Sequence, residues 1–261
     1  MKKQHPITSV GVDYGGTWIR IVFLNSKNKI CKKITLPSEP IEKLPKIFKS
    51  QFKKLGIHSL LYLNIGAKGI WKKYKRKKLF RSLKGLASSI QIYPDIQVVY
   101  DMVLKNKPGI VLIAGTGSIA YGKNSNNQWM RSGGFGPQKG DEGSAYWMSK
   151  MWKNNFNLDK LNSVRKSALI AKNILLKAEK KHPLAKKIMD QAHLHLIELL
   201  KPILFKLNLG TTVRLGYWGG LFKNNYFLKR FLKTLKKEIP DIQWKIYKSK
   251  IDPELYVAQL K

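Results

Sequence analysis

Two short turns combine glycine with hydroxyl or carboxylate side chains, a composition suited to holding phosphate. The first is Asp13-Tyr14-Gly15-Gly16-Thr17, which ends an apolar segment that begins at Ser9. The second is Gly115-Thr116-Gly117-Ser118, which follows the apolar residues 110–114. Glycine lets the backbone approach a ligand closely, and successive N–H groups can cradle phosphate oxygens. Each turn alone is equally typical of a β-hairpin, but the pair predicts two turns that grip one polyphosphate across a single cleft.

Two further segments are rich in glycine. Residues 133–144 contain five glycines in twelve positions. Ordering so many glycines costs conformational entropy, so we interpret this segment as a shaped binding loop. Asp141 or Ser144 could instead cap the helix that follows. Residues 216–220 also precede a helix, and their glycines would let a flat base lie against the backbone, with a simple turn as the alternative.

Two aspartates stand where they could act on a bound phosphate. Asp13 ends a buried strand, where it could hold Mg²⁺ through water, because magnesium dehydrates reluctantly. Asp101 follows residues 97–100, which we interpret as another strand. A carboxylate at the carboxyl end of a strand faces the crevice in which α/β sheets bind ligands. Asp101 could therefore accept the proton of an attacking hydroxyl, and a helix N-cap is the alternative.

Composition narrows the class of protein. The 261 residues are 43% hydrophobic and 25% charged, as expected for a globular chain of one or two domains. The single cysteine, Cys31, excludes a disulfide scaffold and a cysteine-held zinc or iron–sulfur site within one chain. Because no run of 18 apolar residues and no signal-peptide pattern is present, we expect a cytoplasmic protein without a transmembrane helix.

The net charge of +35 is extreme, yet only seven of the 50 basic residues are arginine. Proteins that read nucleic acid favour arginine for bidentate contacts, so lysine scattered along the chain indicates a compositional bias more than a polyanion partner. A basic run at residues 72–84 is interpreted as a solvated helix face, with nucleic-acid contact as the alternative. In either case the positive field should attract anionic ligands such as nucleotides.

Hydrophobic periodicity predicts two halves with the same order of elements, each opening with a strand, a glycine turn and a return strand. In the first half we predict strands at 9–13, 20–24, 30–36, 59–65 and 97–100, and helices at 41–55 and 71–86. In the second we predict strands at 110–114, 119–123, 128–131, 213–217 and 243–247, and helices at 142–153, 161–179, 183–207, 223–237 and 253–260. Pro202 should kink the long helix. This order predicts an α/β protein of two lobes, residues 1–107 and 108–261.

These motifs, in this order, resemble the BadF/BadG/BcrA/BcrD-type ATPase family, part of the superfamily of acetate and sugar kinases, Hsc70 and actin. The most specific match begins at Gly133, where the family pattern G-G-x-G-x-x-x-G-D-E-G-S-A-Y-W is nearly reproduced. Residues 115–118 match the second phosphate motif, residues 13–17 the first and residues 215–222 the adenosine motif. Within the family the chain looks most like the N-acetylglucosamine kinases. The dehydratase activators of the other branch use paired cysteines, which Cys31 alone does not provide.

The resemblance implies a fold of two actin-like (ribonuclease H-like) lobes with a nucleotide cleft between them, and it implies roles for individual residues. Asp101 matches the catalytic base that accepts the proton of the sugar 6-hydroxyl, and Asp13 matches the aspartate that supports Mg²⁺. The residues that match ATP contacts are Gly15, Gly16, Thr17, Trp18, Gly117, Ser118, Gly219 and Gly220. The residues that match contacts to the amino sugar are Asp101, Thr116, Gly133, Gly134 and Asp141.

We therefore expect an enzyme that uses ATP and Mg²⁺ to phosphorylate an amino sugar, with the 6-hydroxyl of N-acetylglucosamine as the favoured acceptor. Its partners would be small molecules and not a membrane, and a homodimer is left open. The alternative is a nucleotide-binding regulator or nucleic-acid-associated protein of the same fold without sugar kinase activity. The charge of +35 motivates that alternative.

Overall fold

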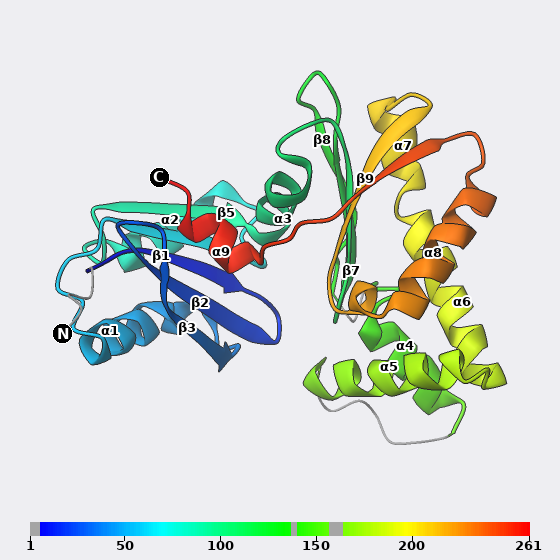
Figure 1. The fold of residues 1–261 in the computed structure, drawn as a ribbon, viewed down its shortest axis with the longest axis horizontal. Coiled ribbons are helices and arrows are strands. Elements are labelled where there is room, and N and C mark those ends of the chain that lie inside the picture. Colours follow the sequence, from blue (N-terminus) through cyan, green and yellow to red (C-terminus); the bar gives the residue numbers. More distant parts are fainter. Residues whose placement is uncertain (1–5, 137–139, 157–163) are drawn as a thin grey trace. The chain divides into compact units, whose positions relative to one another are not determined.

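The computed structural model describes residues 6–136, 140–156 and 164–261, and the chain divides into two compact units (Figure 1). Unit 1 contains residues 1–102 and 249–261, and unit 2 contains residues 103–248. This division differs from the expected lobes, residues 1–107 and 108–261, in two ways: the first boundary lies after residue 102, and residues 249–261 belong to unit 1. No helix among the described residues is long and apolar enough to cross a bilayer.

Unit 1 is built on a five-stranded mixed sheet in the order β3-β2-β1-β4-β5. Strands β1, β2 and β3 form an antiparallel meander, and β4 and β5 run parallel to β1, so the carboxyl ends of β1, β4 and β5 lie at one edge. The strands are β1 (Ile7–Tyr14), β2 (Trp18–Asn25), β3 (Ile30–Pro37), β4 (Tyr62–Ala67) and β5 (Ser89–Pro94). The helices are α1 (Leu44–Lys54), α2 (Lys73–Leu83), α3 (Asp95–Leu104) and α9 (Pro253–Ala258), with a 3₁₀ turn at Ile41–Lys43.

Unit 2 repeats this plan with a sheet in the order β10-β9-β6-β7-β8. Again three strands form an antiparallel meander and two more run parallel to the first, which confirms the predicted α/β class and the two similar halves. The strands are β6 (Gly109–Ala114), β7 (Ser118–Lys123), β8 (Trp129–Gly133), β9 (Thr212–Trp218) and β10 (Gln243–Tyr247). The helices are α4 (Ala145–Asn154), α5 (Val164–Glu179), α6 (Pro183–Glu198), α7 (Lys201–Leu207) and α8 (Asn225–Glu238), with a 3₁₀ turn at Leu221–Lys223.

Helix α9 packs so closely on β1 that it explains why residues 249–261 belong to unit 1. A Cβ atom at Gly11 would lie 2.1 Å from the backbone oxygen of Glu254, so only glycine permits this approach. Ser9 Oγ donates a hydrogen bond to the carbonyl of Ala258 at 2.5 Å. On β4, Asn64 Nδ2 donates to the carbonyl of Val257 at 3.0 Å. The helix therefore covers one face of the β1–β4 pair.

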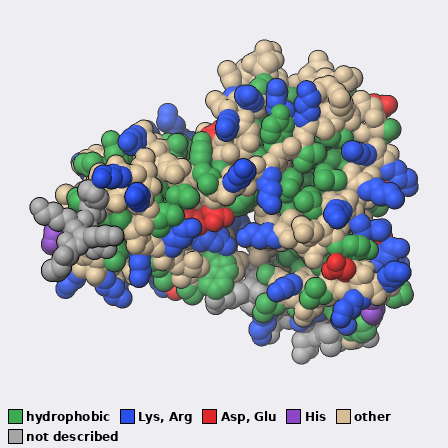
Figure 2. Space-filling model, viewed as in Figure 1, with side chains coloured by type: hydrophobic (Ala, Val, Ile, Leu, Met, Phe, Trp, Pro, Cys, Tyr) green, Lys and Arg blue, Asp and Glu red, His purple; other side chains and the backbone are tan. Residues whose placement is uncertain are grey.

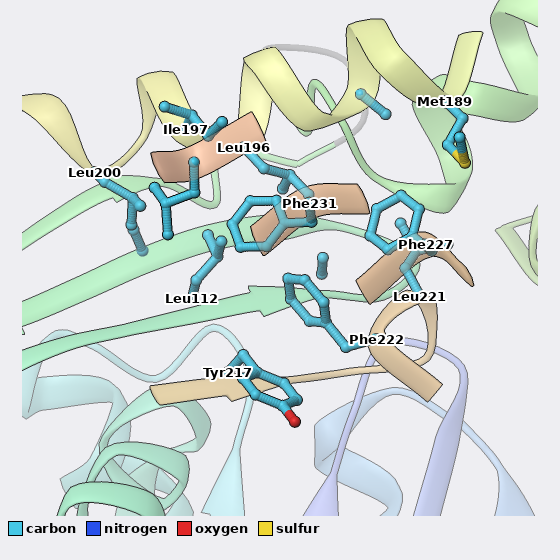
Figure 3. Close-up of a cluster of buried hydrophobic side chains, with 14 of the residues drawn as sticks. Leu112, Met189, Leu196, Ile197, Leu200, Tyr217, Leu221, Phe222, Phe227 and Phe231 are labelled. Atoms are coloured by element: carbon cyan, nitrogen blue, oxygen red, sulfur yellow. The ribbon is translucent and has the colours of Figure 1, made fainter. Parts of the chain in front are cut away.

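The core of unit 2 fixes the loop that follows β9. Leu221 and Phe222 come directly after the Gly219-Gly220 pair and are buried. The ring of Phe222 meets the ring of Phe231 edge to face, with centroids 5.3 Å apart. Figure 3 shows these rings together with Phe227 in one apolar cluster beside the strands of the sheet. The glycine pair is thus held at the end of β9 by the buried residues next to it.

One predicted strand is wrong. Residues 97–100 lie inside helix α3, and the strand at this place in the chain is β5, residues 89–94. The apolar side chains of Ile96, Val99, Tyr100 and Val103 recur at helical spacing, and all four are buried. A short apolar run of this kind can be taken for a buried strand when only its local composition is considered.

The long helix predicted at 183–207 is interrupted between Glu198 and Lys201, so the structure has two helices, α6 and α7, in its place. Pro202 lies in the first turn of α7, where its missing N–H leaves no hydrogen bond unmade. The expected kink at Pro202 is therefore found as a break. The predicted helix start at 161–163 lies outside the described residues.

Candidate functional site

The first predicted turn, between β1 and β2, is held in place by its own backbone and by a neighbouring segment. The N–H of Gly15 donates to the carbonyl of Trp18 at 3.0 Å and closes the hairpin. From the side, Ser38 Oγ donates to the carbonyl of Gly15 at 2.8 Å. Thr17 Oγ1 is buried and has no hydrogen-bond partner among the described residues. A buried hydroxyl without a partner costs free energy, which a ligand at the turn would recover.

Asp13 lies beside this turn in an ion pair. Its Oδ2 atom accepts a hydrogen bond from Arg20 Nη1 at 2.9 Å, and its side chain is only 16% exposed. Burial raises the pKa of Asp13 to about 6; Arg20 opposes this shift, and the nearby charges of Asp95 and Asp252 add to it. The Asp13 carboxylate is therefore easier to protonate than an ordinary aspartate.

The donor set at this edge suits a magnesium ion held partly by water. Mg²⁺ prefers oxygen ligands and keeps several of its waters. The carboxylates of Asp13 and Asp95 are oxygen donors, and the charge of Asp95 contributes to the raised pKa of Asp13. No group of three or more His, Cys, Asp or Glu side chains that could hold a metal occurs in the described parts of the chain. These residues fit an ion that takes its remaining ligands from water and phosphate, and they do not form a complete protein cage.

Asp95 is a site residue that was not predicted from the sequence. It is the first residue of α3 and directly follows Pro94, the last residue of β5. Its Oδ1 atom accepts a hydrogen bond from the N–H of Ile96 at 2.9 Å. Burial raises the pKa of Asp95, while this hydrogen bond and the charge of Lys68 lower it. The alternation in Ser-Ile-Gln-Ile-Tyr-Pro immediately before Asp95 is the signal that could have located it at a strand end.

Asp101 does not lie at a strand end, so the expectation for its position is wrong. It is six residues beyond Asp95 within α3. Its charge adds to the effect of burial in raising the pKa values of Tyr93 and Tyr256, which places it near those two phenols. The position at the carboxyl end of a strand, on which the prediction for Asp101 depended, is occupied by Asp95.

The second predicted turn, between β6 and β7, is supported by Asp141. The N–H of Gly115 donates to the carbonyl of Gly117 at 2.9 Å. The buried carboxylate of Asp141 accepts a hydrogen bond from the N–H of Ser118 at 3.4 Å. A Cβ atom at Gly117 would lie 2.9 Å from Asp141 Oδ2. Asp141 is therefore packed against the turn, and Gly117 provides the space for its carboxylate.

The other predicted residues of unit 2 gather around the same turn. The N–H of Gly134 donates to the carbonyl of Ser118 at 2.9 Å, which joins the end of β8 to the turn. Gly219, with φ +111°, lies so close to β6 that a Cβ atom would be 2.3 Å from the carbonyl oxygen of Ala114. Because β6 and β9 are parallel, their carboxyl ends meet at one edge. Thr116 lies in the turn after β6, Gly220 follows β9, and Gly133 is the last residue of β8.

Ser144, and not Asp141, caps the helix that follows the glycine-rich segment. Its Oγ atom accepts a hydrogen bond from the N–H of Trp147 at 3.2 Å, at the start of α4. The N–H of Ala145 donates to the carbonyl of Gly115 at 2.8 Å, so the start of α4 is tied to the second turn. Residues 137–139 of this segment lie outside the described part of the chain.

The basic run at residues 72–84 lies on α2, where Tyr74 and Phe80 are exposed. Arg76 uses its Nη1 atom locally, in hydrogen bonds to the carbonyls of Ile70 and Trp71. Figure 2 shows Lys and Arg side chains over the visible surface of both units. The positive charge is therefore general to the surface in view and not confined to α2.

Comparison with known proteins gives one family and several relatives. A model of the BadF/BadG/BcrA/BcrD ATPase family matches residues 10–255. Over 68 residues the chain is 41% identical to an N-acetylmuramic acid/N-acetylglucosamine kinase of Clostridium acetobutylicum, a match that spans 26% of this chain and only 22% of that protein.

Solved structures of similar fold cover almost the whole chain. A putative N-acetylglucosamine kinase from Chromobacterium violaceum has a TM-score of 0.70 at 15% identity and covers 97% of this chain and 98% of its own. A ROK family glucokinase from Streptomyces griseus, in complex with glucose and AMPPNP, has a TM-score of 0.64 at 14% identity, with 96% of each chain covered. These matches confirm the expected fold class of two actin-like units.

Proposed function

Because this chain belongs to the BadF/BadG/BcrA/BcrD ATPase family, we propose that it is an ATP-dependent kinase of an amino sugar. N-acetylglucosamine, phosphorylated at its 6-hydroxyl, is the favoured acceptor. The family supports the use of ATP, and the 41% identical segment of a kinase for N-acetylmuramic acid and N-acetylglucosamine supports the class of sugar. The observation that carries the proposal is the arrangement of Asp95 and Asp13 beside a glycine turn at one edge of the unit 1 sheet.

Asp95 is the proposed catalytic base. The hydroxyl oxygen of the sugar attacks the γ-phosphorus of ATP, the bond from that phosphorus to the bridging oxygen breaks, and ADP leaves. Asp95 accepts the hydroxyl proton. A general base works best when its pKa is close to the working pH, and burial moves the pKa of Asp95 upward in that direction. The start of α3 fixes the carboxylate through the N–H of Ile96.

Both units supply proposed contacts to the nucleotide. In unit 1 these are Gly15, Gly16, Thr17 and Trp18. The buried hydroxyl of Thr17, which has no partner in the described part of the chain, would donate to a phosphate oxygen. In unit 2 they are Gly117 and Ser118 for phosphate and Gly219 and Gly220 for the base. Asp13 would hold Mg²⁺ through water, and the ion would neutralise charge on the transferring phosphoryl group.

The proposed sugar contacts are Thr116, Gly133, Gly134 and Asp141. Asp141 has a second task, because its carboxylate already supports the turn at Gly117 and Ser118. A change at Asp141 would therefore affect the phosphate turn as well as the sugar.

Sugar-dependent release of ADP tests the proposed function. The purified protein is incubated with ATP and Mg²⁺ and with N-acetylglucosamine, glucosamine, N-acetylmuramic acid or glucose in turn. We expect the N-acetylated sugars to stimulate ADP release most. If no sugar stimulates it, and the protein instead binds DNA or RNA with an affinity that falls steeply with salt, the alternative of a nucleic-acid-associated protein is correct.

A further inference from the structure

A lysine that the sequence analysis did not single out lies against the first turn. Lys68 directly follows Ala67, the last residue of β4, and is exposed. Its backbone N–H donates to the carbonyl of Tyr14 at 2.9 Å, which extends the pairing of β4 with β1 by one residue. The sheet therefore fixes the backbone of Lys68 in space, although the side chain is exposed to solvent.

The Lys68 side chain passes over Gly16. A Cβ atom built at Gly16 would lie 3.0 Å from Lys68 Nζ, 3.6 Å from its Cδ and 3.9 Å from its Cε. The last three heavy atoms of the lysine side chain thus lie beside Gly16, on the side where any other residue would carry a Cβ atom. The ammonium group can lie this close to the turn because Gly16 has no side chain to occupy the space.

The surroundings of the ammonium group give it no fixed partner. Lys68 Nζ makes no hydrogen bond or ion pair with any residue in the described ranges. Its charge acts on Asp95 at the same edge of the sheet. Close by, the buried hydroxyl of Thr17 also has no partner among those residues. A cation, a hydroxyl and the backbone of a glycine turn are the donors that a phosphate chain requires.

We infer that Lys68 binds the β- and γ-phosphates of the nucleotide at the turn formed by Gly15, Gly16 and Thr17. The ammonium group adds a positive charge to the neutral N–H and O–H donors of the turn. As the γ-phosphoryl group is transferred, this charge stabilises the negative charge that develops on its oxygens. The inference rests on the proposed nucleotide site and does not depend on which sugar is the acceptor.

Nucleotide affinities test this inference without any turnover. The dissociation constants of ATP, ADP and AMP are measured by calorimetry for the wild type, Lys68→Met and Lys68→Arg, with Lys49→Met as the control. Lys49 is an exposed lysine on α1 in the same unit. We expect Lys68→Met to weaken ATP and ADP binding about tenfold, because hydrogen bonds to charged groups are among the stronger ones. AMP binding should not change, Lys68→Arg should retain most of the affinity, and Lys49→Met should equal the wild type.

Two results would overturn the inference: wild-type ATP affinity in Lys68→Met, and a loss of AMP affinity equal to the loss for ATP. If the first result came with reduced turnover, the lysine would act on Asp95 and not on the nucleotide. Failure of the proposed function is a different result: a wild type that responds to no sugar can still show the Lys68-dependent preference for ATP over AMP. A wild type that binds no nucleotide contradicts both.

Discussion

Asp13 and Asp95 lie at the same edge of the unit 1 sheet, and the charge of Asp95 raises the pKa of Asp13. Asp13 lies in β1 and Asp95 directly follows β5, and strand β4 stands between these two strands. Two carboxylates that share such an edge favour the uptake of a proton or a cation, since like charges disfavour joint ionisation. The effects of the two aspartates can be measured separately, as turnover for Asp95 and as the pH dependence of stability for Asp13.

Replacement of Asp95 by asparagine should remove the base and keep the shape of the site. We expect Asp95→Asn to reduce turnover roughly 10²–10⁴-fold, the usual contribution of general-base catalysis, with little change in ATP affinity. Steady-state ADP release and calorimetry measure the two quantities. Asp101→Asn is the matched control on the same helix and should retain most of the turnover. If Asp101→Asn lost turnover and Asp95→Asn did not, Asp95 would not be the base.

The raised pKa of Asp13 should make unit 1 less stable as the pH rises from about 4 to about 6. Its pKa in the folded state is about 6, above the ordinary value of 3.8. Between these values the folded state binds more protons than the unfolded state, so the free energy of unfolding falls with rising pH. Urea denaturation across this range should show a fall on the order of 2–3 kcal/mol in the wild type relative to Asp13→Asn. If the free energies of unfolding of the wild type and Asp13→Asn changed with pH by the same amount, the prediction would be contradicted.

Gly11→Ala should destabilise unit 1 by forcing α9 away from β1. The added Cβ atom would lie 2.1 Å from the backbone oxygen of Glu254, and backbone cannot move aside as a flexible side chain can. Overpacking usually costs about 1–3 kcal/mol, and a backbone clash should reach the upper end. Gly220→Ala is the control for stability, because nothing lies within 4 Å of its Cβ position and its φ is −63°. Equal melting temperatures for the two variants would show that α9 does not hold this position.

Gly117→Ala should disturb Asp141, and a second substitution should relieve the effect. The new Cβ atom would lie 2.9 Å from Asp141 Oδ2, so the carboxylate must leave the turn and ATP binding should weaken. Asp141→Gly removes the carboxylate, and glycine suits the φ of +63° at this position. In the double variant the loss of stability from Gly117→Ala should shrink, as a double-mutant cycle would measure. Strictly additive losses would mean that the two residues do not interact.

Much of the fold could be predicted from local pattern, and the site only in part. The glycines at 15, 16, 115 and 117 located both turns, because a strand that ends in such residues must turn there. The same local information could not separate Asp95 from Asp101. The segment from Ile96 to Leu104 is apolar enough for either a buried strand or a buried helix, and the choice decides which aspartate follows a strand.

Two features could not be predicted because they depend on contacts far apart in the chain. Lys68 is one of many lysines, and only the pairing of β4 with β1 brings it to Gly16. Helix α9 was predicted at nearly its observed place, yet no local pattern states which sheet it covers. Its assignment to unit 1 follows from the glycine at position 11, whose partner is more than 240 residues away in sequence.

The return of α9 to unit 1 sets an order for folding during synthesis. Ser9 and Ala258, which share a hydrogen bond, are 249 positions apart. At about 5–20 residues per second the ribosome needs on the order of 12–50 s to travel that distance. All of unit 2 is synthesised within this interval. Val22 and Leu24 pack against Ala258 in the folded protein, so they lack this contact until the end of the chain has been made. The second half of the nascent chain can thus mature before the first, and the uncovered side of β2 is where a chaperone would find apolar surface.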